Sequence, residues 1–218
     1  MALHPKFPDD PHVILDPGIR WFPADEALRE KRSDQLMPPL VPMLRKEVKA
    51  WRDRGYDGAT ETSKSLLRWW FVEQHLAPAT YAGSLMEEFR YFFAQREALE
   101  TIVYLMDVVG FKDKFDLMRF DSSGRMTTGQ FDETWRRLVV KMATGTGKTK
   151  VLSLVLAWSF FHKVYEPDSK LARNFLVIAP NIIVLDRIYK DFQGLRIFFQ
   201  DPVVPDNGFD GRNWRDDF

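Results

Sequence analysis

The apolar residues in the first half of the chain recur at helical spacing. Side chains three or four positions apart lie on one face of a helix, so this spacing predicts three helices. Thr60 or Thr62 is placed to cap the second helix, which carries Leu66 and the residues that follow. The first helix carries Leu40, Leu44, Val48 and Trp51, the second Leu66, Leu67, Trp69, Trp70 and Val72, and the third, over residues 95–109, Ala98, Ile102, Leu105 and Val109. Proline-rich residues 1–40 predict irregular backbone, with a short helix near residues 24–32.

After residue 134 the pattern changes to short apolar runs that alternate with helices. Residues 138–140 and 174–179 are apolar and β-prone, and each run leads into a predicted helix, over residues 147–164 and 182–192. Strands of this kind alternating with helices are typical of a parallel sheet that is covered on both faces. The polar residues 110–134 and 201–218 predict loops. We therefore expect an α/β domain over residues 86–218, preceded by a mainly helical region over residues 1–85.

Composition excludes several classes of protein. The 218 residues include 31 Lys and Arg and 31 Asp and Glu, and this zero net charge argues against a protein that wraps nucleic acid over its whole surface. The absence of cysteine excludes disulfides, thiolate metal sites and a thiol nucleophile. The four histidines lack ligand spacing. Apolar runs fall short of the about 20 residues that span a bilayer, so we expect no membrane segment and a cytoplasmic location.

The residues that carry chemistry are MATGTGKT, at positions 142–149. Gly145 and Gly147 let backbone N–H groups point at phosphate oxygens, and the helix that follows adds the positive end of its dipole. Lys148 is expected to reach the β- and γ-phosphates, and the hydroxyl of Thr149 is expected to bind Mg²⁺. A chance Gly/Thr turn is the alternative interpretation. The expected phosphate-binding residues are Thr144, Gly145, Thr146, Gly147, Lys148 and Thr149.

These residues resemble motif I of the superfamily 2 helicases and translocases. Those enzymes tolerate a residue other than Gly at the first loop position, where this chain has Met142. Residues 175–184, FLVIAPNIIV, resemble motif Ia of the same enzymes, in which a strand ends in Ala-Pro and a helix follows. The resemblance implies that Pro180 and Asn181 contact the sugar–phosphate backbone of a nucleic-acid strand. A plain strand-to-helix turn is the alternative.

Upstream, Gln95-Arg-Glu-Ala98 resembles the Q-x-E-A element that precedes motif I in many of these enzymes. The resemblance implies that the Gln95 amide, with one donor and one acceptor group, reads the edge of adenine. Its neighbours Tyr91 and Phe92 are placed to stack on the base. A solvent-facing glutamine at a helix start is the plain alternative. The Trp69-Trp70-Phe71 cluster is interpreted as core rather than as a base-stacking surface.

Over residues 85–200 the sequence looks most like the restriction subunit of type III restriction enzymes and their DEAD/DEAH-type relatives. This resemblance implies an incomplete RecA-like P-loop NTPase domain, a parallel sheet flanked by helices. It implies ATP and Mg²⁺ as cofactors and ATP hydrolysis with Lys148 as the catalytic residue. The hydrolysis is expected to drive translocation or a conformational switch on double-stranded DNA. The resemblance also implies a modification methyltransferase subunit as a partner and a separate nuclease domain that cuts DNA.

The sequence lacks an apolar strand that ends in Asp-Glu after the loop, where the acid that holds Mg²⁺ is expected. We therefore expect the chain to be the N-terminal part of a longer enzyme and to hydrolyse ATP poorly or not at all by itself. Two other classes stay open. One is a P-loop module of a kinase-like or regulatory kind, and the other is an interaction module in the first 85 residues beside a decaying ATPase.

Overall fold

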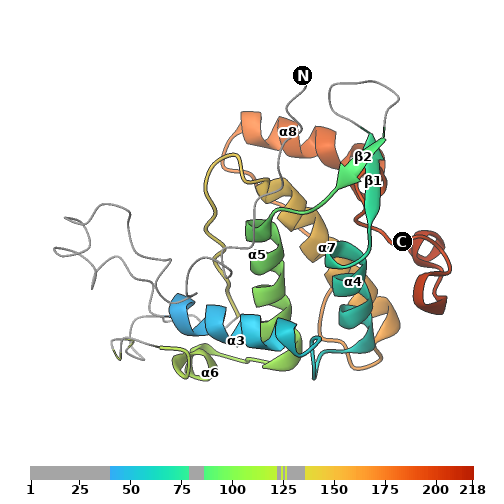
Figure 1. Cartoon of the computed structure of the whole chain (residues 1–218). Coiled ribbons are helices and arrows are strands. Elements are labelled where there is room, and N and C mark those ends of the chain that lie inside the picture. Colours follow the sequence, from blue (N-terminus) through green and yellow to red (C-terminus); the bar gives the residue numbers. More distant parts are fainter. Residues whose placement is uncertain (1–39, 79–85, 122–123, 125, 127–135) are drawn as a thin grey trace, which may run out of the picture. The chain divides into compact units, whose positions relative to one another are not determined.

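The computed structural model describes residues 40–78, 86–121, 124, 126 and 136–218 (Figure 1). Backbone contacts divide the chain into two compact units. The first takes its described residues from the stretch that ends at Ala59 and from Glu100–Lys141, and the second from Thr60–Leu99 and Met142–Phe218. The helix expected near residues 24–32 lies outside the described residues, and the division at residue 85 stays a prediction.

The first unit is built around Trp51 of helix α3 (Val41–Asp53). Pro42 lies in the first turn of α3, where its missing N–H has no partner to lose. The Trp51 ring is 4.9 Å from that of Tyr56 and 5.3 Å from that of Tyr104, and its indole N–H donates to the carbonyl of Asp57 at 2.9 Å. The indole ring therefore packs against two other rings, and its N–H has a hydrogen-bond partner.

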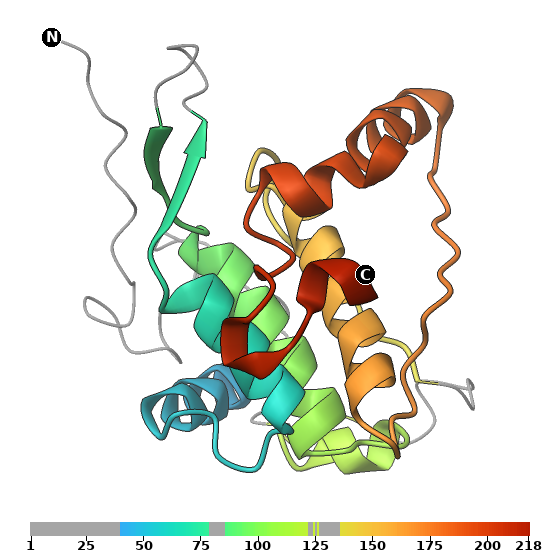
Figure 2. The same cartoon turned by 90° about the vertical axis from the view of Figure 1, so that its right-hand side faces the viewer.

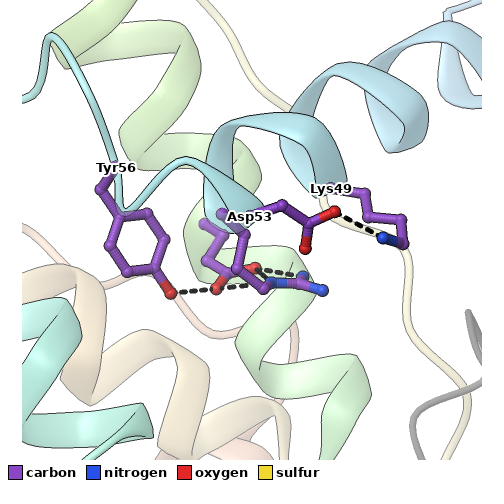
Figure 3. Close-up of polar contacts among 5 residues, drawn as sticks. Lys49, Asp53 and Tyr56 are labelled. Carbon is purple, nitrogen blue, oxygen red and sulfur yellow. Dashed lines mark hydrogen bonds and ion pairs between the residues drawn. The ribbon is translucent and has the colours of Figure 1, made fainter.

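A buried carboxylate joins α3 to the end of helix α5 (Phe93–Val103). Glu100 is fully buried and accepts from Arg52 Nε at 3.0 Å and 2.9 Å, with a further contact from the same guanidinium. The hydroxyl of Tyr56 donates to the same carboxylate at 2.6 Å (Figure 3). A buried charge needs such partners, because burial removes its hydration.

The unit also contains two short helical turns. The helix predicted over residues 95–109 is present as α5 and the π-helical turn η1 (Tyr104–Val108) that continues it. Helix α6 (Lys114–Met118) lies where a loop is predicted. Asp113 caps α6 by accepting from the N–H of Phe115 at 2.8 Å. Of the stripe predicted over residues 95–109, Leu105 is buried, whereas Ala98, Ile102 and Val109 are only partly buried. Leu99 and Val103 are fully buried instead.

In the second unit, helix α4 (Glu61–Phe71) lies beside helix α7 (Lys148–Tyr165), as Figures 1 and 2 show. Thr60 caps α4 by accepting from the N–H of Ser63, which confirms one of the two predicted caps. The indole N–H of Trp158 on α7 donates to the Ser63 hydroxyl at 2.8 Å. Trp70 is buried, which confirms the core interpretation for this residue of the aromatic cluster.

The last 18 residues were predicted as loop, and the structure packs them onto α4 and α7 instead. The indoles of Trp69 and Trp70 donate to the carbonyls of Pro202 at 3.0 Å and Val203 at 2.8 Å. Trp214 is fully buried against α7. The segment contains the turns η4 (Phe209–Gly211) and α10 (Trp214–Asp217). Hydrogen bonds to its backbone and its scattered buried apolar residues, rather than any periodicity, hold it in place.

The predicted parallel sheet is not present among the described residues. Their sheet is a two-stranded antiparallel pair, β1 (His75–Pro78) and β2 (Met86–Phe89), in which His75 pairs with Phe89. Residues 138–140 and 174–179 form no strand, and Figure 2 shows an extended trace between α7 and α8. Parallel strands need hydrogen-bonded neighbours and covered faces, whereas Leu176 is 86% exposed and Ile178 81% exposed.

The helix predicted over residues 182–192 is confirmed as α8 (Ile182–Phe192). A 3₁₀ turn, η3 (Gln193–Leu195), leads into helix α9 (Arg196–Gln200), which contacts both α7 and α8. Among the described residues, no helix has the length and apolar character needed to cross a lipid bilayer.

The Arg52–Glu100 pair generates a stability prediction. Replacing Arg52 with Met removes the guanidinium from a buried carboxylate, so the free energy of unfolding should fall by about 3–5 kcal/mol. Lys49→Met is the matched control, because Lys49 pairs with Asp53 in a partly exposed i,i+4 contact worth less than about 1 kcal/mol (Figure 3). Urea unfolding measures both. Equal losses in the two variants would contradict the assignment of Glu100 as a buried charge that depends on Arg52.

Candidate phosphate-binding site

The loop at residues 142–149 ends in the first turn of α7, and two glycines set its path. Gly145 has φ +83° and Gly147, the N-cap of α7, has φ +75° and ψ +46°. Both angles lie in the left-handed region, which glycine adopts without steric cost. The glycines predicted from the sequence therefore stand where the backbone conformation requires them.

The N-terminus of α7 carries features that favour an anion. No side chain caps it, and its first turn contains no acidic residue. The first N–H groups of a helix lack intrahelical partners and carry the positive end of the helix dipole. Thr149 lies within this turn and is partly buried, while Thr144 in the loop is exposed. These features fit a bound phosphate, because phosphate supplies the missing negative charge and acceptor atoms.

In this structure the loop closes on its own backbone. Lys148 Nζ donates to the carbonyl of Ala143 at 2.8 Å, and the hydroxyl of Thr146 donates to the same carbonyl at 2.7 Å. The Lys148 side chain is exposed. A phosphate oxygen is a charged acceptor and forms a stronger hydrogen bond with an ammonium group than a neutral carbonyl does. The lysine contact is therefore one that a phosphate group can replace.

Gln95 joins the start of α5 to this loop. Its Nε2 donates to the carbonyl of Thr146 at 3.0 Å, and its Oε1 accepts from the N–H of Phe92 at 2.9 Å. The residue is only 3% exposed. A Cβ added at Gly147 would lie 2.3 Å from Nε2, so the glutamine packs directly on that glycine. The structure thus brings Gln95 together with the loop, as the order of motifs suggested.

The predicted role of Gln95 as an adenine reader is not settled by these contacts. Each amide atom already has one protein partner, although Nε2 keeps a second proton and Oε1 a second lone pair. Contact with a base would have to use that remaining capacity or exchange one of the two bonds. Adenine recognition by Gln95 therefore stays a prediction.

A second lysine beside the loop was missed by the sequence analysis. Lys150 Nζ forms an ion pair with Asp201 and lies 5.3 Å from the centre of the Phe89 ring. Lys150 directly follows Thr149, so its nearness to the loop could have been noticed. Its partner could not, because Asp201 lies 51 residues further along the chain and no local pattern links the two.

Pro180 and Asn181 lie at the start of α8, on the exposed surface. Asn181 is the N-cap of this helix, and its Oδ1 accepts from the N–H of Val184 at 3.0 Å. The helix predicted after this corner is confirmed, but the strand predicted before it is not present, because residues 174–179 form no strand. Its contact with nucleic acid stays a prediction. Among the described residues, no group of three or more His, Asp or Glu side chains is placed to hold a metal ion.

A family model described as "Type III restriction enzyme, res subunit" matches residues 88–208, which is 121 of the 218 residues. The matched stretch contains Gln95, the loop and the Pro180–Asn181 corner. Searches of curated proteins and of solved structures found no match.

The contact between Gln95 and Gly147 generates a prediction for a pair of alanine variants. Gly147→Ala should lower the free energy of unfolding by about 2–3 kcal/mol, because the left-handed backbone and the displaced Gln95 amide both cost free energy. Gly145→Ala is the control, since Gly145 has φ +83° and no atom within 4 Å of an added Cβ, which leaves only a backbone cost of about 1–2 kcal/mol.

Chemical denaturation measures these losses, and a double-mutant cycle isolates the contact. In a Gln95→Ala background the extra cost of Gly147→Ala over Gly145→Ala should disappear, because the clashing amide is gone. If the two glycine variants cost the same in the wild-type background, Gln95 does not constrain the loop.

Proposed function

Because the chain belongs to the type III restriction enzyme res subunit family, we propose that residues 86–218 are the ATP-binding part of an ATP-dependent DNA helicase or translocase. Membership of the family points to a nucleotide-binding module of a helicase or restriction enzyme that acts on DNA. The observation that carries the proposal is the loop itself. Two left-handed glycines lead into an uncapped helix N-terminus, with an exposed lysine beside it.

The chain's own residues give each part of this proposal a physical role. Lys148 leaves the carbonyl of Ala143 and binds the β- and γ-phosphates, where it offsets their negative charge. The backbone N–H groups at the start of α7 donate to phosphate oxygens. The Thr149 hydroxyl is the proposed ligand of Mg²⁺, which supplies charge neutralisation on the phosphates when bound.

The domain is proposed to adopt the RecA-like fold of the family. Residues 138–140 and 174–179 are the apolar segments that a sheet of that fold would take as strands, although they form no strand in the described structure. The support is local: each segment is apolar and precedes an expected functional corner, the loop in the first case and Pro180 in the second. The exposed Val139, Leu176 and Ile178 are side chains of the kind that such a sheet buries.

Double-stranded DNA is the proposed substrate of the motor. The exposed start of α8 at Pro180 and Asn181 is proposed to contact the sugar–phosphate backbone, since a helix N-terminus attracts phosphate. A modification methyltransferase subunit is the proposed protein partner, as in type III restriction enzymes. Contact with the backbone rather than with base edges implies binding that tolerates many sequences.

Nucleotide binding by a Lys148→Ala variant tests the phosphate role. ATP affinity should fall at least about tenfold, because a charge-assisted contact to the phosphates is lost. Lys64→Ala is the control, since Lys64 lies on α4 of the same unit and pairs with Glu61 at 2.9 Å. Calorimetric titration with Mg²⁺ measures both. Unchanged ATP affinity in Lys148→Ala would refute the proposal.

Double-stranded DNA in the same titration separates a DNA motor from a kinase-like or regulatory module. Coupling between two ligands is reciprocal, so DNA should change ATP affinity by the same factor by which ATP changes DNA affinity. A factor of one in both directions would speak for a module that does not act on DNA.

The choice of base tests Gln95. If its amide reads adenine, the wild-type protein prefers ATP to GTP, and Gln95→Ala reduces that preference. Competition of the two nucleotides against a fluorescent analogue measures the ratio of affinities. Equal binding of ATP and GTP by the wild type would show that Gln95 supports the loop without selecting the base.

A further inference from the structure

The first turn of α7 pairs with an acidic residue from the C-terminal part of the chain. This turn contains no acidic residue of its own. Lys150 lies in it, and its ammonium group forms an ion pair with the carboxylate of Asp201, 51 residues further along the chain. The pair is mostly covered by protein, since 33% of the Lys150 side chain and 18% of the Asp201 side chain are exposed. Salt therefore screens these two charges less than it screens an ion pair on the open surface.

The ammonium group of Lys150 has a second contact that holds it in place. It lies 5.3 Å from the centre of the Phe89 ring, a distance at which the face of an aromatic ring attracts a cation. The backbone N–H of Lys150 donates to the carbonyl of Gly147 at 3.0 Å, which ties the residue to the N-cap of the same helix. The positive charge therefore keeps one of its contacts when the charge of Asp201 is removed.

A turn with two buried residues presents Asp201. Asp201 follows α9 directly, and its carbonyl accepts from the N–H of Val203 at 2.7 Å. The N–H of Val204 donates to the carbonyl of Phe198 at 3.1 Å, and the side chains of Val203 and Val204 are fully covered by the protein. The backbone beside the carboxylate is thus anchored in the core of the second unit.

The charges of this pair act on an anion bound at the start of α7. A helix rises about 1.5 Å per residue, so Lys150 lies about 5 Å along the axis from the N-cap Gly147. The Debye length is about 8 Å at physiological ionic strength, so a charge in this turn is only partly screened from the helix N-terminus. The ammonium group of Lys150 attracts an anion there, and the carboxylate of Asp201 repels it.

We propose that the Lys150–Asp201 pair sets the affinity of the loop for phosphate groups. Lys150 is a second cation of the phosphate site, and Asp201 is an internal anion that weakens binding there. This inference rests on the proposed function. In the structure the two charges cancel, so the pair adds no net charge to the site. The turn that presents Asp201 is therefore an autoinhibitory contact.

This role differs from a mechanical one in the sign of its effects. Neutralising Lys150 leaves the negative charge of Asp201 acting on the phosphates, whereas neutralising Asp201 leaves the positive charge of Lys150. The two changes therefore shift affinity in opposite directions, although both remove the same ion pair. A pair that only holds the helix turn in place would weaken binding in both cases.

The experiment measures binding of inorganic tripolyphosphate and of ATP, both with Mg²⁺, to the 218-residue chain by calorimetry. Asp201→Asn keeps an acceptor for Lys150 but removes the negative charge, so affinity for both ligands should rise about two- to fivefold. Lys150→Met should lower both affinities by about the same factor. The double variant should bind within about twofold of the wild type, because the net charge of the two positions is again zero. All changes should shrink when the salt concentration is raised to about 0.5 M.

The matched control uses the ion pair of Asp186 and Lys190, which join at 2.7 Å on α8 of the same unit and are largely exposed. Asp186→Asn and Lys190→Met change the net charge of the chain by the same amounts and should leave both affinities unchanged. Circular dichroism checks that each variant is folded. Lys150→Gln, which also removes the charge, takes the place of Lys150→Met if that variant is unfolded.

The outcomes separate this inference from the proposed function. If the wild type binds neither ATP nor tripolyphosphate, the proposed function fails and this inference fails with it. If the wild type binds both ligands and the two single variants both bind more weakly, the pair holds the helix turn mechanically and its electrostatic role is refuted. Unchanged affinity in both single variants refutes it too, as does a double variant that binds more weakly than either single variant.

Discussion

The hydrogen bond from the Gln95 amide to the carbonyl of Thr146 is the interaction on which the loop depends. A loop with two left-handed glycines has many accessible conformations, and fixing one of them costs backbone entropy. Gln95 offsets this cost from a position on a regular helix, with its other amide atom held by the N–H of Phe92. A Cβ at residue 147 would lie 2.3 Å from Gln95 Nε2, so a larger residue there would displace the amide from this contact.

Two side-chain donors of the loop already have hydrogen-bond partners within the loop. The Ala143 carbonyl accepts from both Lys148 and Thr146, so these donors are paired in the structure. Binding of a phosphate is then an exchange of partners rather than the ordering of a free segment. The gain is the difference between a charged and a neutral acceptor, together with the dipole at the start of α7. Such an exchange costs less entropy than ordering a mobile loop.

The features that sequence predicted well are those set by neighbouring residues. The bounds of α8, nearly all of α7, the Thr60 cap and the two loop glycines follow from spacing and from glycine chemistry. The contacts it missed are long-range. Lys150 pairs with Asp201, 51 positions away, and the Trp70 indole donates to the carbonyl of Val203, 133 positions away. No local pattern encodes either contact. The β1–β2 pair was missed because its strands have four residues each and no alternating pattern.

The parallel sheet shows where a local pattern is insufficient. An apolar run such as residues 174–179 indicates only that its side chains are suited to burial. A strand forms when other strands and helices supply that cover. In the structure Leu176 and Ile178, two positions apart, are both exposed, and the N-terminal residues Ile182 and Ile183 of α8 are exposed as well. Large exposed patches of apolar side chains are uncommon in folded monomers. A RecA-like sheet between two helical layers would bury both the strand and the apolar face of the helix that follows, and the described residues do not supply that cover.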